Sequence, residues 1–333
     1  MNTATTHKIF NPVEGHILRT LVYYDIFNYP LKAEEVFRFL GTNHVDVSIV
    51  ASHLNGLRDQ HLIFQFENFF SLKNNINPID RRKKGNVEAE KYLLLAEKKA
   101  QLISKFPFVR AVMASGSLSK GYMDEKSDLD FFIVTAPSRL WIARTLLVLY
   151  KRVFLFNSHK YFCVNYFVDE KHLEIEEKNL FTATELATVI PLYGSKQYEN
   201  LHRVNAWLKK IFPNYTPRSI ANVPTTKLSW GKRIAERFLD LFFGNALEKY
   251  CQKKTMDRWR KQYEKNYSAT DFKVAFKSKP YASKNHPRNY QRSVMEVYSE
   301  KLKSFGINSN PSQEDATHES LPKYEPLKTN FTV

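Results

Sequence analysis

Apolar residues recur at helical spacing along the first part of the chain. The stretches GHILRTLVYYDIF and LKAEEVFRFLG each predict a helix, the second ended by Gly41, and residues 45–57 predict a third helix with one apolar stripe. LIFQFENFFSL then predicts a hairpin that turns at residues 67–68. Three short helices followed by a hairpin is the order of a winged helix, so the pattern predicts a winged-helix-like unit over residues 1–75.

The third of these helices is poorly suited to contact DNA. It carries only Arg58 and nearby histidines as basic groups, whereas phosphate contacts normally need several lysines or arginines. A packing or partner-binding role is favoured for this unit, and nucleic acid stays an alternative partner.

Strands and helices alternate in the centre of the chain. Residues 73–86 are polar and predict a linker, and residues 87–106 predict a long amphipathic helix. Predicted strands and further helices follow; the strands are 109–115, 128–135 and 161–168, and the helices are 139–154, 179–190, 198–212 and 230–252. This order predicts an α/β (α+β) core.

The amino-acid composition of the chain changes from about residue 267. Lys, Asn, Ser and Pro dominate and the apolar periodicity fades, which predicts a basic tail over residues 267–333 that need not fold. The predicted organisation is therefore the winged-helix-like unit, an αβ domain over residues 87–215, C-terminal helices over residues 216–266, and the tail.

The amino-acid composition limits the expected binding partners and the expected cellular compartment. The chain has 50 Lys and Arg against 34 Asp and Glu, a formal charge of +16 that favours nucleic acid, anionic lipid or nucleotide phosphate. Cys163 and Cys251 are the only cysteines, so neither a disulfide scaffold nor a cysteine zinc site is expected. The most apolar stretch, LWIARTLLVLYKRVFLF, contains Arg144, Lys151 and Arg152, so no membrane insertion is expected. The first residues lack the apolar segment of a signal peptide, and the expected location is cytoplasmic.

The stretch VMASGSLSKGYMDEKSDLDFFIV, residues 112–134, contains the candidate chemistry. Asp128 and Asp130 stand at the predicted start of a strand, where residues i and i+2 project from one face. Two adjacent carboxylates repel each other, and a hard cation that takes oxygen ligands from both removes the repulsion. The pair therefore predicts a Mg²⁺ (or Mn²⁺) site in which substrate phosphates complete the coordination.

The residues before this pair are suited to receive phosphate. Gly116 permits a tight turn with close backbone approach, and Ser117 offers a hydroxyl and a backbone N–H. Lys120 adds positive charge, and Ser127 directly precedes the first carboxylate; these four residues are the predicted nucleotide-binding set. A Gly-Ser pair alone is usually just a turn, and an Asp-x-Asp pair is often merely solvated. Their order between two strands favours a joint function.

GSLSKG followed by SDLDFFIV resembles the signature of the nucleotidyltransferase superfamily, whose members share a polymerase β-like fold. The resemblance covers residues 109–135 and extends through the predicted strand 161–168. It implies a mixed sheet flanked by helices, and transfer of a nucleoside monophosphate from a nucleoside triphosphate while pyrophosphate leaves. Asp128 and Asp130 would bind the metals. The acceptor can be a small molecule, a protein or an RNA.

The resemblance also implies a third carboxylate, which this sequence does not supply clearly. The predicted strand 161–168 carries Asn165, whose amide can coordinate a metal but cannot accept a proton. Asp169 shares the face of Asn165 if the strand continues, so either residue can fill the catalytic position. Without the third carboxylate, the chain would be a catalytically weak or inactive nucleotide-binding module whose winged-helix-like unit binds DNA or a partner. A nucleic-acid binder driven by the basic tail is the third interpretation.

Overall fold

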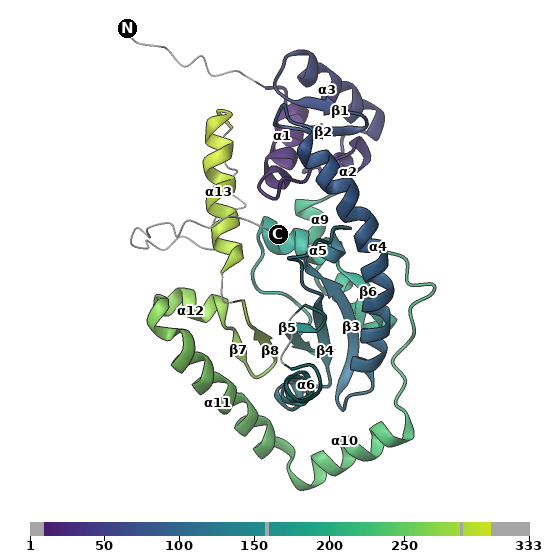
Figure 1. Ribbon diagram of the computed structural model, residues 1–333, viewed down its shortest axis with the longest axis vertical. Helices are drawn as coiled ribbons and strands as arrows, with labels where there is room; N and C mark the ends of the chain where they lie inside the picture. Colours follow the sequence, from purple (N-terminus) through teal and green to yellow (C-terminus); the bar gives the residue numbers. More distant parts are fainter. Residues whose placement is uncertain (1–9, 157–159, 287–288, 308–333) are drawn as a thin grey trace.

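The computed structural model describes residues 10–156, 160–286 and 289–307, and its centre is a six-stranded mixed sheet flanked by helices (Figure 1). The strand order is β6-β3-β4-β5-β8-β7, and neighbours are antiparallel except for the parallel pair β4 and β5. The strands of this sheet are β3 (Val109–Ser115), β4 (Asp130–Thr135), β5 (Cys163–Asp169), β6 (Ile190–Tyr193), β7 (Ser278–Lys279) and β8 (Ala282–Lys284). The predicted α+β class is confirmed.

Helices cover both faces of the sheet (Figure 1). One buried apolar cluster joins the sheet to α4, α6 and α11, and another joins its opposite face to α1, α7 and α13. The helices are α1 (Pro12–Asp25), α2 (Ala33–Arg38), α3 (Val47–Asp59), α4 (Asn77–Ser104), α5 (Gly116–Ser119), α6 (Leu140–Phe154), α7 (Leu180–Thr188), α8 (Ser195–Val204), α9 (Leu208–Ile211), α10 (Trp230–Phe242), α11 (Gly244–Tyr263), α12 (Ala269–Ala275) and α13 (Tyr290–Ser304).

The alternation of β4 distributes its side chains between the two clusters. Phe131 and Ile133 pack with α4 and α6, whereas Phe132 and Val134 belong to the cluster that contains α1 and α7. All four side chains are buried, because this central strand is covered on both faces. Asp130 is the first residue of β4, so alternation places its carboxylate on the face of Phe132.

The N-terminal unit has three helices and a hairpin, in the order that the sequence predicts. The hairpin pairs β1 (Phe64–Phe66) with β2 (Phe69–Ser71) in antiparallel register. Asn11 caps α1 through a capping box, and Asp46 caps α3 by accepting two backbone N–H bonds. The order of elements is the predicted one, and the assignment of this unit as a winged helix stays a prediction.

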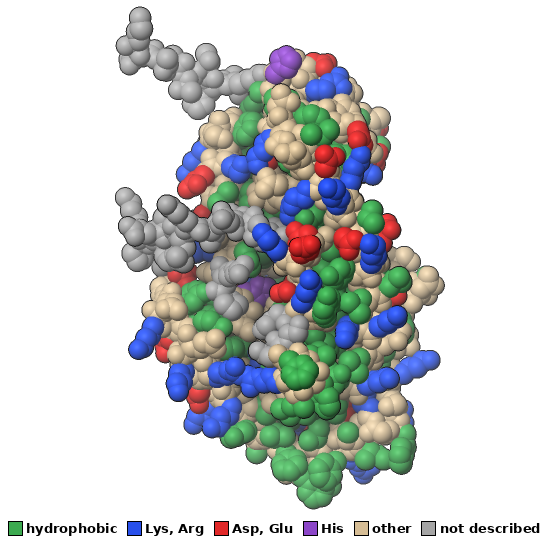
Figure 2. Space-filling model, viewed as in Figure 1, with side chains coloured by type: hydrophobic (Ala, Val, Ile, Leu, Met, Phe, Trp, Pro, Cys, Tyr) green, Lys and Arg blue, Asp and Glu red, His purple; other side chains and the backbone are tan. Residues whose placement is uncertain are grey.

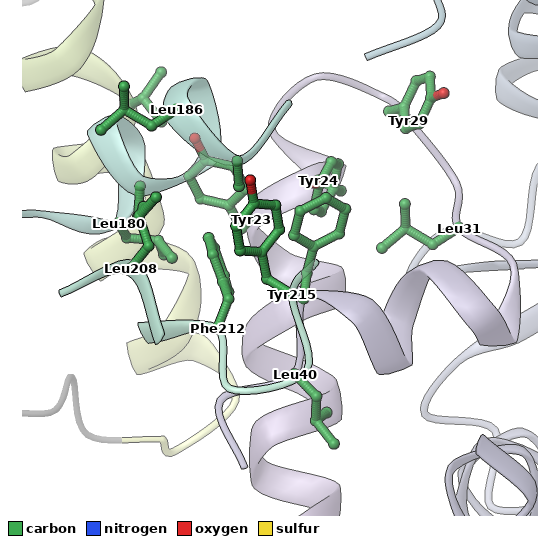
Figure 3. Close-up of a cluster of buried hydrophobic side chains, with 14 of the residues drawn as sticks. Tyr23, Tyr24, Tyr29, Leu31, Leu40, Leu180, Leu186, Leu208, Phe212 and Tyr215 are labelled. Carbon is green, nitrogen blue, oxygen red and sulfur yellow. The ribbon is translucent and has the colours of Figure 1, made fainter. Parts of the chain in front are cut away.

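The N-terminal unit shares a core with the rest of the protein. Tyr23 and Tyr24 of α1 belong to one buried cluster with Phe212 and Tyr215, and leucines of α7 and α9 complete it (Figure 3). The ring centroids of Tyr24 and Phe39 are 5.4 Å apart, and those of Phe39 and Phe212 are 5.3 Å apart. This unit therefore packs directly against the central sheet domain.

The predicted linker at residues 73–86 is wrong, because α4 begins at Asn77 and occupies most of it. The side chain of Arg82 is only 4% exposed, and its guanidinium binds the Glu35 carboxylate at 2.6 and 2.8 Å. The same guanidinium lies 4.2 Å from the centroid of the Tyr29 ring. In a sequence pattern, a buried arginine that pairs with a carboxylate counts as a polar residue. The pattern therefore could not reveal that Arg82 belongs to a packed helix.

Residues 269–286 and 289–304 contain α12, β7, β8 and α13, where composition predicted a tail that need not fold. β8 pairs with β5 and thereby extends the central sheet. Lys277 and Lys284 are buried, and Lys277 pairs with Glu177 at 2.7 Å. Two very short strands, with one buried lysine directly before β7 and another at the end of β8, leave no apolar period for sequence analysis to detect. The rest of the predicted tail, residues 308–333, lies outside the described residues.

Several later elements also differ from the expected ones. The predicted helix 198–212 is divided into α8 and α9, and the predicted helix 230–252 is divided at Gly244, whose φ is +40°. β6 was missed because it is a four-residue edge strand that contains Pro191. In the described part of the chain, no helix combines the length and the apolar character needed to cross a bilayer.

Candidate functional site

The glycine bend and the second carboxylate of the predicted site lie against each other. β3 ends at Ser115, which pairs with Asp130 at the start of β4, so the chain leaves the sheet at Gly116 directly beside that carboxylate. Gly116 has a φ of +63°, and a Cβ placed on it would lie 3.2 Å from Asp130 Cγ and closer still to Oδ2. Both the left-handed backbone and the contact therefore require glycine at this position.

Asp128 lies in the loop that leads into β4. The expectation that the strand begins at Asp128 is wrong, because the strand starts at Asp130. Between the two acids, Leu129 is fully buried, and its backbone exchanges hydrogen bonds of 2.9 Å with Lys160 O and Cys163 N. This anchor to the start of β5 holds the half-buried acids on either side of Leu129.

Asp130 has an unusual electrostatic environment. Burial is the largest cause of its raised pKa of about 7; a hydrogen bond with the Cys163 thiol opposes the shift, and the charges of Asp128 and Glu185 add to it. Asn165 Nδ2 donates a hydrogen bond of 2.9 Å to Asp130 Oδ1. Because desolvation and nearby negative charges both disfavour the ionised form, a bound cation would stabilise this carboxylate.

Asn165 is the β5 residue whose side-chain amide contacts the Asp130 carboxylate. In the parallel pair of β4 and β5, Asp130 is opposite Cys163 at one end, and Asp169 lies at the other end. A register shift beside Asn165 leaves one extra residue in β5, which turns Asp169 onto the other face, so the expectation of a shared face is wrong. The Asp169 carboxylate instead lies 2.7 Å from His172 Nδ1.

Glu185 of α7 is a site residue that sequence analysis missed. Its Oε1 lies 2.8 Å from Lys120 Nζ, and the same amine donates to Gly116 O at 3.1 Å. Lys120 thus links the glycine bend to a carboxylate that also acts on Asp130. Glu185 is the one acid of α7, and this isolated charge in an otherwise uncharged helix was the available signal.

The two serines of the predicted set have different surroundings. Ser127 is buried; its hydroxyl donates to Asp124 Oδ1 at 2.8 Å and accepts from Asp124 N at 3.1 Å, so it closes the turn before the two acids. Ser117 is half-buried in the one-turn helix α5, and its carbonyl accepts from Lys120 N and Tyr122 N. These contacts give Ser127 a structural role, and phosphate binding by Ser117 stays a prediction.

The segment after the bend, residues 119–121, is fixed by hydrogen bonds from residues that are distant in the sequence. Three donors bind consecutive carbonyls there: the Tyr29 hydroxyl binds that of Lys120 at 2.7 Å, Arg218 Nη2 binds that of Ser119 at 2.9 Å, and the Asn86 amide binds that of Gly121. The N-terminal unit and α4 therefore help to fix the backbone that would face a phosphate.

The donor set fits magnesium only together with a substrate. Among residues 10–156, 160–286 and 289–307, no three His, Cys, Asp or Glu side chains gather in a way that could hold a metal ion. Asp128 and Asp130 supply two carboxylates, which is what Mg²⁺ commonly receives from protein when substrate phosphates and water fill its other positions.

Two cavities of the described residues lie near the N-terminal unit. One is lined by residues of α1 with Pro30 and Phe70, and the other lies among α1, Phe212 and Tyr298. Neither cavity is lined by Asp128 or Asp130.

No protein family model, curated protein or solved structure matches this chain. The resemblance to nucleotidyltransferases therefore rests on the sequence motif within residues 109–135 alone. In the structure, this motif consists of a glycine bend in contact with the half-buried Asp130 carboxylate, a second carboxylate two residues away, and a lysine on the bend.

Proposed function

We propose that this protein is a metal-dependent nucleotidyltransferase. It transfers a nucleoside monophosphate from a nucleoside triphosphate to an acceptor hydroxyl on a small molecule, a protein or an RNA. The observation that carries the proposal is the close contact between Gly116 and the Asp130 carboxylate, with Asp128 two residues away. It brings a surface suited to phosphate oxygens against a surface suited to Mg²⁺ or Mn²⁺.

Each residue of the site has a distinct task in this proposal. Asp128 and Asp130 hold the divalent cation, which when bound offsets the charge of the triphosphate and of the leaving pyrophosphate. The backbone at Gly116 and Ser117 receives phosphate oxygens, and Lys120 adds positive charge beside them. The acceptor oxygen then attacks the α-phosphorus in line with the leaving group, and catalysis comes mainly from positioning and electrostatics.

The proton of the acceptor hydroxyl needs a recipient other than Asn165. An amide cannot accept that proton, and the Asn165 Nδ2 group is already donating to Asp130. We assign Glu185 as the carboxylate that accepts this proton. It forms an ion pair with Lys120 next to the bend, and its charge raises the pKa of Asp130. In this proposal, Asn165 fixes the orientation of the Asp130 carboxylate.

The proposal is tested by incubating the purified chain with each labelled nucleoside triphosphate and Mg²⁺ or Mn²⁺. Release of pyrophosphate and label transfer to the protein or to added acceptors are measured. The wild-type chain should turn over at least one triphosphate, and the Asp128→Asn/Asp130→Asn variant should lose about 10³-fold or more. Asp257→Asn, an exposed acid on α11, is the matched control and should remain active.

Equal turnover by the double variant and the wild type would disprove the assignment of the site. Tight nucleotide binding without turnover would favour the second function, a nucleotide-binding module of low or no catalytic activity. The specific observation behind that alternative is Asn165, an amide, at the β5 position beside Asp130.

A further inference from the structure

Helix α10 exposes most of its large apolar residues to solvent, while Leu239 packs against the protein. Trp230, Ile234, Phe238, Leu241 and Phe242 are 81%, 47%, 53%, 76% and 63% exposed, respectively. At about 100° per residue, these five positions cover roughly a third of the helix circumference. Figure 2 shows hydrophobic side chains gathered at the lower edge of the molecule, where Figure 1 places α10. A helix on a protein surface normally packs such a stripe against the protein, whereas α10 presents its stripe to solvent.

The inward face of α10 is held by polar contacts. Glu236 binds Arg110 with hydrogen bonds of 2.8 and 2.9 Å, and it also accepts a backbone N–H at 2.6 Å. Lys232 is buried and donates to two backbone carbonyls at 2.6 and 2.7 Å, and Asp240 pairs with Arg139. Rotation of α10 to bury its stripe would expose or break the buried contacts of Glu236 and Lys232, so the stripe stays outside.

The surroundings of the stripe are positively charged. Arg233 and Arg237 of α10 and Lys249 and Lys253 of the adjoining α11 are exposed. Residues 230–263 contain 9 Lys and Arg but only 4 Asp and Glu, and two of these acids are already paired with arginines. An apolar stripe rich in aromatic residues and bordered by cations is complementary to a surface that is apolar beneath and anionic above.

We propose that α10 lies flat in the surface of an anionic lipid bilayer. The apolar stripe enters the boundary between headgroups and acyl chains, and the neighbouring arginines and lysines contact the anionic headgroups. A helix of 13 residues is about 20 Å long, too short to span the hydrocarbon core and suited to lie in its plane. A second copy of this chain fits less well, because the positive borders of two stripes would face each other in a symmetric dimer.

Vesicle flotation with the full chain tests this proposal. The chain should float with vesicles of equal parts phosphatidylglycerol and phosphatidylcholine, and much less with phosphatidylcholine alone. Leu241→Gln/Phe242→Gln should lower the binding by about tenfold or more, because two apolar side chains no longer enter the bilayer. Val87→Gln/Leu94→Gln, which alters two exposed apolar residues of α4, is the matched control and should bind like the wild type.

Fluorescence gives an independent readout of the same contact. Trp230 is 81% exposed, whereas Trp141 and Trp259 are buried, so anionic vesicles should shift the emission to shorter wavelength and Trp230→Phe should remove most of that shift. Failure to float with anionic vesicles, or equal flotation of the Leu241→Gln/Phe242→Gln variant, would overturn the proposal. So would a dimer in solution that this variant converts to a monomer, since the stripe would then bind a second copy.

The membrane proposal and the nucleotidyltransferase proposal can fail separately. Asp128→Asn/Asp130→Asn leaves α10 untouched and should float like the wild type. The Leu241→Gln/Phe242→Gln variant should keep its turnover of nucleotide in the absence of lipid.

Discussion

At Gly116 the backbone conformation and the contact with Asp130 impose the same requirement. The φ of +63° belongs to the left-handed region, and the side chain of any other residue would collide with the Asp130 carboxylate. Sequence analysis can identify this glycine as a turn residue. It cannot show that the space above the glycine is filled by a carboxylate 14 residues later.

Gly116→Ala should therefore affect the site more than the fold. We expect a loss of about 1–2 kcal/mol in the free energy of unfolding from the left-handed backbone, and a loss of about a hundredfold in nucleotide turnover as Asp130 is displaced. Thermal unfolding and turnover measure the two effects. Gly56→Ala is the control: a Cβ at Gly56, within α3, meets nothing within 4 Å, so stability should be unchanged or higher. A Gly116→Ala variant with full turnover would contradict the role of this contact.

At the scale of elements, the long apolar runs were the most predictable feature. β3, β4, β5 and α6 lie within a few residues of their expected positions, because buried strands and an amphipathic helix leave a strong pattern. Elements stabilised by distant polar contacts were missed or misjudged. In the first turns of α4, Arg82 packs against Tyr29 and pairs with Glu35. The short strand β8 ends at Lys284, which is buried.

The start of α6 illustrates why such contacts escape a sequence pattern. No residue just before α6 caps it with a side chain. Instead, the Glu248 carboxylate of α11 accepts hydrogen bonds from Trp141 N at 2.7 Å and from Ile142 N at 2.9 Å. A cap supplied from more than 100 residues away has no local signature, so sequence analysis could find the helix but not what fixes its end.

The same limit applies to the candidate site. Gly116, Asp128 and Asp130 are close in sequence and could be identified as a group. Glu185 enters from α7, and the extra residue in β5 that separates Asn165 from Asp169 depends on how two strands pair. Neither can be derived from the alternation of one strand.

At the scale of the whole molecule, two half-buried histidines predict a loss of stability in acid. Burial lowers the pKa of His202 to about 4 and that of His286 to about 3, from the ordinary value of 6.5. The unfolded chain therefore binds more protons than the folded protein below pH 6.5. This contribution to stability is complete above pH 6.5 and is lost as the pH falls toward 4.

Melting temperatures at several pH values between about 7.5 and 4.5 measure this effect. The melting temperature should fall below about pH 6.5, and His202→Gln should reduce the fall because one half-buried histidine no longer needs to become charged. His44→Gln, at an exposed position, is the control and should leave the pH profile unchanged. A profile that is equally steep in the wild type and in His202→Gln would contradict this assignment.

The most direct test of the proposed site measures Mn²⁺ binding by electron paramagnetic resonance, with and without nucleoside triphosphate. Two carboxylates and the triphosphate together should hold the ion, so the wild-type chain should bind Mn²⁺ far more tightly with nucleotide than without it. The Asp128→Asn/Asp130→Asn variant should lose that nucleotide-dependent binding. If the double variant binds Mn²⁺ and nucleotide as the wild type does, the acids beside the glycine bend do not form the metal site.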